Sequence, residues 1–252
     1  MALVEEMEPE IEDLLLRIAP SLPNDWQGAS SEEIDKIETI AGRPLPKFYL
    51  WFLSRMGRSM GPLTYPTLDF TAPRVLSCYA DELFPPHPRF LMIGHESDEV
   101  MPAHLLYDFD HPARDDARIV SMEHIDGVVR NQFETFREMI GWGKFLSYRV
   151  NRFPHRCTGA FVDDEGDVLS RLDPLMESLG FTAPIPTGAC CALYDSTQTG
   201  MVSSCAPGDE PCLHFFVLGG HDVGSLRRTL GAIRNETGLG VEIRSWDPPS
   251  SG

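Results

Sequence analysis

The 252-residue sequence predicts an α+β fold, in which helices flank mostly antiparallel sheets. Helical periodicity of apolar residues dominates residues 9–57, whereas residues 104–110 alternate between apolar and acidic side chains as a half-buried strand does. From residue 155 onward, the expected order is strand, helix, three strands, helix and strand. That order predicts a small α+β unit, which could form a ferredoxin-like sheet with one added strand.

These patterns divide the chain into four segments. Residues 1–23 hold an N-terminal helix, and residues 24–150 form the first α+β domain. Residues 155–247 form the smaller C-terminal domain, and residues 248–252 are a disordered tail.

The first two predicted helices are indicated by an apolar stripe on the first and by capping residues at both ends of the second. Ile11, Leu14, Leu15 and Ile18 form one apolar stripe on the first helix. Ser30 and Glu33 have the spacing of a capping box at the start of the second, and Gly42 is placed to end it.

The stretch GRPLPKFYLWFLSRMG, residues 42–57, predicts an extended turn followed by a helix that is apolar nearly all round. Pro46 can begin this helix because a first-turn residue needs no N–H partner, and Gly57 ends it. The core-facing stripe consists of Leu45, Phe48, Tyr49, Phe52, Leu53 and Met56. Leu50 and Trp51 lie off that stripe, and we expect residues outside the first domain to cover them, most simply those of the C-terminal unit.

Residues 58–92 are rich in proline, glycine and aromatics and predict no regular element beyond the start of a strand at 89. Strands are expected at 89–96, 104–110 and 118–122. A helix is expected over 124–146, with an apolar face of Val129, Phe133, Phe136 and Ile140.

The C-terminal unit predicts a strand at 158–162 and a helix at 167–180, followed by a proline-rich linker. Three strands follow at 189–194, 201–205 and 213–220. Asp222 then caps a helix that ends at Gly238, and residues 240–246 form the last strand.

The charge balance excludes some classes of protein. A formal net charge of −17 argues against nucleic acid as a partner, because such binders present a basic surface to the phosphates. The N-terminus has no pattern of a signal peptide, and no apolar run is long enough to cross a membrane. Six cysteines without an export signal indicate reduced thiols and a cytoplasmic location.

We expect no catalytic residue, metal site or cofactor. Asp108, Asp110 and His111 could hold a cation, but a solvated strand face explains them as well. The spacing of Cys205, Cys212, His214 and His221 matches no compact zinc motif. An enzyme hidden in the C-terminal unit would instead need a pocket holding two or more of Cys205, His214, His221 and Asp222.

Residues 24–145 resemble the SUKH superfamily, which includes bacterial immunity proteins and a yeast cell-wall regulator. The resemblance rests first on Glu33, Ile34, Ile37, Glu38, Gly42, Leu45, Pro46, Tyr49, Phe52, Leu53 and Gly57. It continues through Ile93-Gly94 and Tyr107-Asp108 in the expected hairpin, and through Phe133, Phe136 and Ile140. The chain departs from the family at Met56-Gly57-Arg58, where Asn-Gly-Gly is frequent, and at Lys47 and Phe48.

The resemblance implies a SUKH-like domain at 24–150 and a non-enzymatic immunity protein that docks on a cognate toxin, often a nuclease or deaminase. An acidic surface would suit a basic toxin. We expect the contact at the acidic loops, through Asp98, Glu99, Asp108, Asp110, Asp115 and Asp116. The alternatives are a regulatory scaffold without a toxin partner, as in the eukaryotic relatives, and the hidden enzyme.

Overall fold

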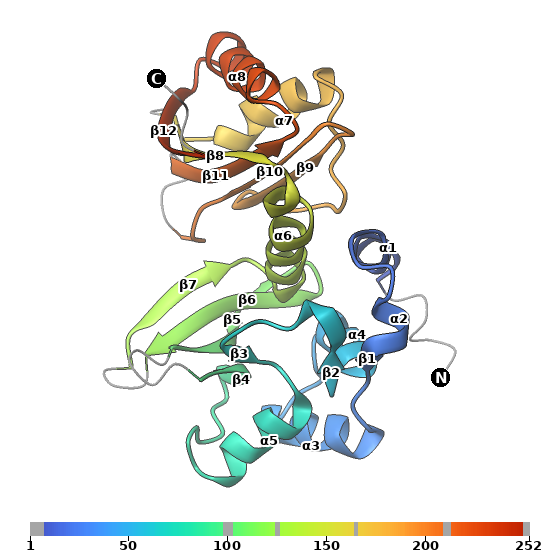
Figure 1. Cartoon of the computed structure of the whole chain (residues 1–252). Coiled ribbons are helices and arrows are strands. Elements are labelled where there is room, and N and C mark those ends of the chain that lie inside the picture. The colour runs from blue at the N-terminus through green and yellow to red at the C-terminus, as the bar shows by residue number, and fades with distance from the viewer. Residues whose placement is uncertain (1–7, 98–102, 124–126, 164–165, 209–212, 249–252) are drawn as a thin grey trace. The chain divides into compact units, whose positions relative to one another are not determined.

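The computed structural model describes residues 8–97, 103–123, 127–163, 166–208 and 213–248. The predicted α+β class is confirmed, with helices and antiparallel sheets in both halves (Figure 1). The chain divides into two compact units, Met1–Met139 and Ile140–Gly252, here called unit 1 and unit 2. The division falls inside helix α6 (Phe136–Tyr148), whereas the sequence placed it between residues 150 and 155. Residues 249–252 of the expected tail lie outside the described residues.

Unit 1 begins with helices α1 (Pro9–Ile18), the single-turn α2 (Leu22–Asp25), α3 (Ser31–Ala41), α4 (Lys47–Met56) and α5 (Ala72–Ala80). Helices α1, α3 and α4 were predicted, whereas α2 and α5 were not. All four residues of the stripe expected on α1 are buried. The strands β1 (Trp26–Gln27) and β2 (Ser59–Met60) form a short antiparallel pair beside them.

The capping signals of α3 take the expected form. The Ser30 hydroxyl accepts a hydrogen bond from the Glu33 N–H, and the Glu33 carboxylate accepts one from the Ser30 N–H at 2.7 Å. Gly42 adopts φ 64°, in the left-handed region that glycine enters without steric cost, and its N–H bonds to the last carbonyls of α3. The chain then turns through Pro44-Leu45-Pro46, and α4 begins at Lys47, with Pro46 as its N-cap.

Helix α4 supplies the aromatic core of unit 1. Phe48, Tyr49, Phe52, Leu53 and Met56 are almost completely buried, as the stripe predicted. The rings pack at centroid distances typical of stacked and edge-on pairs, such as 5.0 Å between Phe52 and Phe136. Phe136 contacts the rings of Phe48, Tyr49, Phe52, Phe70 and Tyr107.

Trp51 lies off the stripe and is nevertheless fully buried. Its indole Nε1 donates to Glu12 Oε2 of α1 at 3.0 Å, and Phe48 stacks on its ring. Arg55 also bonds to Glu12, at 3.3 Å. The N-terminal helix α1 therefore helps to cover Trp51. This helix lies outside residues 24–150, as we expected of the covering residues, although the sequence favoured the C-terminal unit for this role. Leu50 is only half buried.

The main sheet of unit 1 is an antiparallel meander of β3 (Leu68–Asp69), β4 (Phe90–Glu96), β5 (Ala103–Ala113), β6 (Asp116–Glu123) and β7 (Val129–Phe133). Adjacent residues in a strand face opposite sides, so Tyr107 joins the aromatic core while Leu106 packs with Cys78 of α5 on the other face. Gly94 allows close packing here, since a Cβ at this position would lie 2.8 Å from the Phe70 ring.

The prediction of a helix over 124–146 is wrong for residues 129–133. Residues 129–133 form strand β7, in which Val129 pairs with Met122 and Asn131 with Val120. The left-handed Gly127 precedes it, and pairing with β6 outweighs the local helical spacing of the apolar residues. The helix begins only at Phe136, where the Thr135 hydroxyl accepts a hydrogen bond from the Glu138 N–H at 3.1 Å.

Helix α5 was also absent from the sequence prediction. It lies within the stretch 58–92, with a proline in its first turn and Val75 and Cys78 on its buried side. Its nine residues carry too short an apolar stripe to stand out between prolines.

Unit 2 contains the expected elements: β8 (His155–Val162), α7 (Val168–Ser178), β9 (Cys191–Asp195), β10 (Thr199–Ser204), β11 (Leu213–Gly220), α8 (Val223–Ala232) and β12 (Gly240–Asp247). The sheet order is β12-β8-β11-β10-β9, and every neighbouring pair is antiparallel. Strand β11 lies between β8 and β10, and β8 lies between β11 and β12. This is the split βαβ arrangement of ferredoxin-like folds, with β9 as the added edge strand.

One face of this sheet is covered by α7 and α8 (Figure 1). Phe161, Phe216 and Leu218 of the sheet pack there against Leu172 of α7 and Leu226 of α8. Asp222 caps α8 as predicted, with its Oδ1 accepting from the Ser225 N–H at 2.8 Å. At the edge strand β12, a bulge between Ile243 and Ser245 shifts the pairing with β8.

Within the ranges that the structure describes, no helix combines the length and apolar character needed to cross a membrane.

The capping box makes a testable contribution to stability. Replacing Ser30 with Ala removes the acceptor for the Glu33 N–H and should lower the free energy of unfolding by about 1 kcal/mol, measured by urea titration. Ser21→Ala is the matched control, because Ser21 occupies the N-cap of α2 without a side-chain cap bond. Equal effects of the two substitutions would contradict this role.

Candidate functional site

Four of the six predicted acidic residues lie on the β5–β6 hairpin, Asp108 to Asp116, of unit 1. Asp98 and Glu99 lie outside the described residues. The hairpin turns at Arg114 and Asp115, which both have positive φ. Its four carboxylates have very different surroundings, and only two of them are exposed.

Asp108 is almost completely buried and ion-paired. Arg89 donates to both of its oxygens at 2.8 Å, and His111 Nδ1 lies 2.9 Å from Oδ2. Burial alone would raise the pKa of this carboxyl, but the hydrogen bonds from Arg89 and His111 outweigh it and hold the pKa below its ordinary value. Asp108 therefore anchors the hairpin to the residues before β4.

Asp116, the first residue of β6, is also buried, and it lies against the first turn of α6. Its Oδ2 accepts from the Arg137 N–H at 3.2 Å, which places a carboxylate at the helix N-terminus. Burial raises the pKa of Asp116 to about 6. The Tyr107 hydroxyl is close enough to influence that pKa, yet no hydrogen bond of normal geometry joins it to Asp116.

Asp110 and Asp115 are the exposed members of the group. Asp110 Oδ2 lies 3.4 Å from Arg89 Nε, and Asp115 Oδ2 accepts from Lys47 Nζ at 2.9 Å. Exposed ion pairs of this kind contribute little to stability and exchange readily with other partners. These two carboxylates are therefore the ones on the hairpin that another protein could contact.

The described residues of the hidden-enzyme alternative have separate roles in the fold. Asp222 caps α8, His221 packs edge-on against Phe153, and His214 is buried with its Nδ1 3.4 Å from Ser203 Oγ. Cys205 is buried after β10. Among the residues that the structure describes, no group of three or more His, Cys, Asp or Glu could hold a metal ion.

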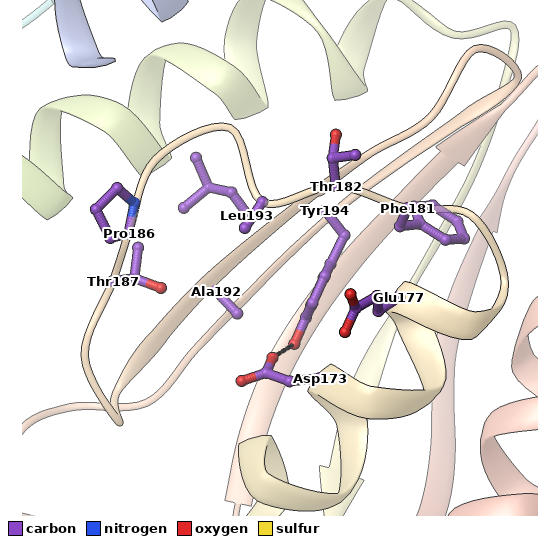
Figure 2. Close-up of a pocket in the computed structure, with 10 residues that line it drawn as sticks. Asp173, Glu177, Phe181, Thr182, Pro186, Thr187, Ala192, Leu193 and Tyr194 are labelled. Carbon is purple, nitrogen blue, oxygen red and sulfur yellow. Dashed lines mark hydrogen bonds between the residues drawn. The ribbon is translucent and has the colours of Figure 1, made fainter. Parts of the chain in front are cut away.

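Unit 2 has a cavity of about 500 Å³ between α7, the linker that follows it and β9. Figure 2 shows Asp173 and Glu177 on successive turns of α7, with Tyr194 of β9 beside them and Pro186 and Thr187 on the linker. The Tyr194 hydroxyl donates to Asp173 Oδ1 at 2.5 Å. Burial and this hydrogen bond raise the pKa of Tyr194, so the hydroxyl stays protonated as a donor.

This cavity was not predicted from the sequence. The i, i+4 spacing of Asp173 and Glu177 on the predicted helix 167–180 was a usable signal, since it places both on one face. The partner Tyr194 could not be assigned, because its approach to Asp173 depends on where β9 enters the sheet.

No family model matches the chain, and no curated protein matches it.

The raised pKa of Asp116 predicts a pH-dependent effect of Asp116→Asn. The carboxyl group of Asp116 binds its proton more tightly in the folded state than in the unfolded state. Protonation of Asp116 therefore stabilises the fold fully below pH 4, and this stabilisation is lost as the pH rises through about 6. The variant cannot titrate at this position. The difference in free energy of unfolding, variant minus parent, should therefore rise by up to about 3 kcal/mol between pH 4 and pH 7, because one pKa unit corresponds to about 1.4 kcal/mol.

Urea titrations of both proteins across this pH range measure the difference. Asp110→Asn is the control, since Asp110 is exposed. A difference that does not change with pH would show that Asp116 titrates normally.

Proposed function

We propose that this chain is a non-enzymatic protein-binding module of the SUKH type, an immunity protein that neutralises a basic toxin by direct docking. The observation that carries the proposal is the uneven charge of the two units. Unit 1, which contains the SUKH-like residues except Ile140, has 25 acidic and 12 basic residues, whereas unit 2 has 13 and 9. Opposite charge accelerates the encounter of two proteins, and an immunity protein must capture its toxin quickly.

The structural roles of the SUKH-like residues support the proposal. Glu33 and Gly42 lie at the two ends of α3, and Leu45, Tyr49, Phe52 and Leu53 are buried in the core. These residues are used in folding, which leaves the exposed hairpin and helix surfaces free to differ between relatives and so to select a partner. Asp110 and Asp115 are our candidates for such contacts.

The first experiment is co-expression with the product of the gene next to the one that encodes this chain. A toxin that is neutralised and that elutes with the chain on gel filtration would support the proposal. Absence of both rescue and complex would contradict it. A stable partner with a signalling or metabolic role, and no toxin, would instead favour a regulatory scaffold.

With the toxin in hand, the double variant Asp110→Lys, Asp115→Asn tests the hairpin. Asn is used at 115 because this position has φ 62°, which Asn tolerates. We expect the association rate constant at low salt to fall about tenfold, because charges at an interface rim act mainly on encounter. Stopped-flow mixing measures this rate.

The matched control is Glu236→Lys, Glu242→Gln in unit 2, where both side chains are exposed. It changes the net charge by the same amount. If it slows association as much as the hairpin variant, only the total charge matters and the hairpin is not the docking site.

A further inference from the structure

The cavity of unit 2 is formed by segments that are held in place without a ligand. Thr182 and Asp195 exchange two backbone hydrogen bonds of 2.9 Å, which fasten the linker to the end of β9. Ile185 of the linker is 1% exposed, so its side chain anchors the segment that carries Pro186 and Thr187. At about 500 Å³, the cavity has the size of sites that take small organic groups.

The charged side chains that line the cavity are both acidic. Asp173 and Glu177 are exposed at their positions one helical turn apart, and the lining that the structure describes includes no basic side chain. Tyr194 is 4% exposed and binds Asp173 Oδ1. This bond fixes the Asp173 carboxylate at the cavity wall while Oδ2 remains available to a ligand. A cation is therefore the complementary ligand.

The apolar side chains that line the rest of the cavity favour one kind of cation over another. Phe181, Pro186 and Ala192 present apolar surface, which fits an aliphatic stem or the face of a planar group. A guanidinium group is planar, weakly hydrated and able to donate several hydrogen bonds in one plane, so it can bridge two carboxylates and lie on apolar walls. An ammonium ion is compact and strongly hydrated, and it would have to give up more water.

We propose that this cavity binds an arginine side chain, with Asp173 and Glu177 accepting hydrogen bonds from its guanidinium group and Phe181 and Pro186 contacting its stem. The arginine is either a free amino acid or a residue on another protein. The inference concerns unit 2 alone and does not depend on the toxin proposal.

The test is a titration of the full-length chain with N-acetyl-L-arginine amide, followed by NMR of backbone amides and by calorimetry. N-acetyl-L-citrulline amide is the matched probe, because its side chain has nearly the same shape and no charge. We expect saturable binding of the arginine probe, shifts centred on residues 173–194, and binding of the citrulline probe that is at least about tenfold weaker.

Two conservative variants locate the contact. Asp173→Asn and Glu177→Gln should each weaken binding of the arginine probe by about tenfold, because each replaces a charged acceptor with a neutral one. Glu236→Gln makes the same change of charge on the exposed surface of unit 2 and should leave the affinity unchanged. The amide spectrum of each variant shows directly whether unit 2 is still folded.

A third arm identifies the source of the arginine. Tighter binding of free L-arginine than of the blocked probe indicates an amino-acid ligand, and the reverse order indicates a residue within a polypeptide. The inference is overturned if both probes bind equally, if neither shifts the cavity residues, or if Glu236→Gln weakens binding as much as Glu177→Gln.

Discussion

The contact of Phe136 with five aromatic rings is the interaction on which unit 1 depends. Phe136 begins α6, and its ring lies within 6.0 Å, between centroids, of rings from α4, from β5 and from Phe70. The segments that carry these rings are far apart in the sequence, so one side chain joins them. Capping of α6 by Thr135 and Asp116 matters for the same reason, because it sets the residue at which the helix begins and hence where this ring lies.

The elements that sequence reasoning predicted well are those whose signals are local. The capping box at Ser30, the turn at Gly42 and the stripe of α4 depend on residues within a few positions of one another. Strand β7 depends instead on pairing with β6, and the spacing from Val129 to Ile140 fits a helix equally well. The sequence could not distinguish the buried acids of the hairpin from the exposed ones for a related reason. Asp108 and Asp110 look alike in the sequence and both lie near Arg89, which precedes Asp108 by nineteen positions. Only Asp108 is buried and accepts from Arg89 through both carboxylate oxygens.

The two proposed binding surfaces use carboxylates in different ways. On the β5–β6 hairpin, the exposed Asp110 and Asp115 lie next to bases of the same unit, so a partner would exchange one set of ion pairs for another. In the cavity of unit 2, a buried tyrosine orients Asp173, and the groups are arranged before any ligand arrives. The hairpin is therefore suited to rapid, salt-sensitive encounter, and the cavity to recognition of one particular side chain.

The bulge in β12 affects how copies of this protein behave at high concentration. β12 is an edge strand, and an unbroken edge is a template on which a second copy could add a strand. The shift between Ile243 and Ser245 interrupts the regular spacing of its backbone groups. The charged Arg244 lies within that shift, and the charged Glu242 precedes it. Sheet-to-sheet aggregation along this edge is thereby discouraged, even though Ile243 is 47% exposed.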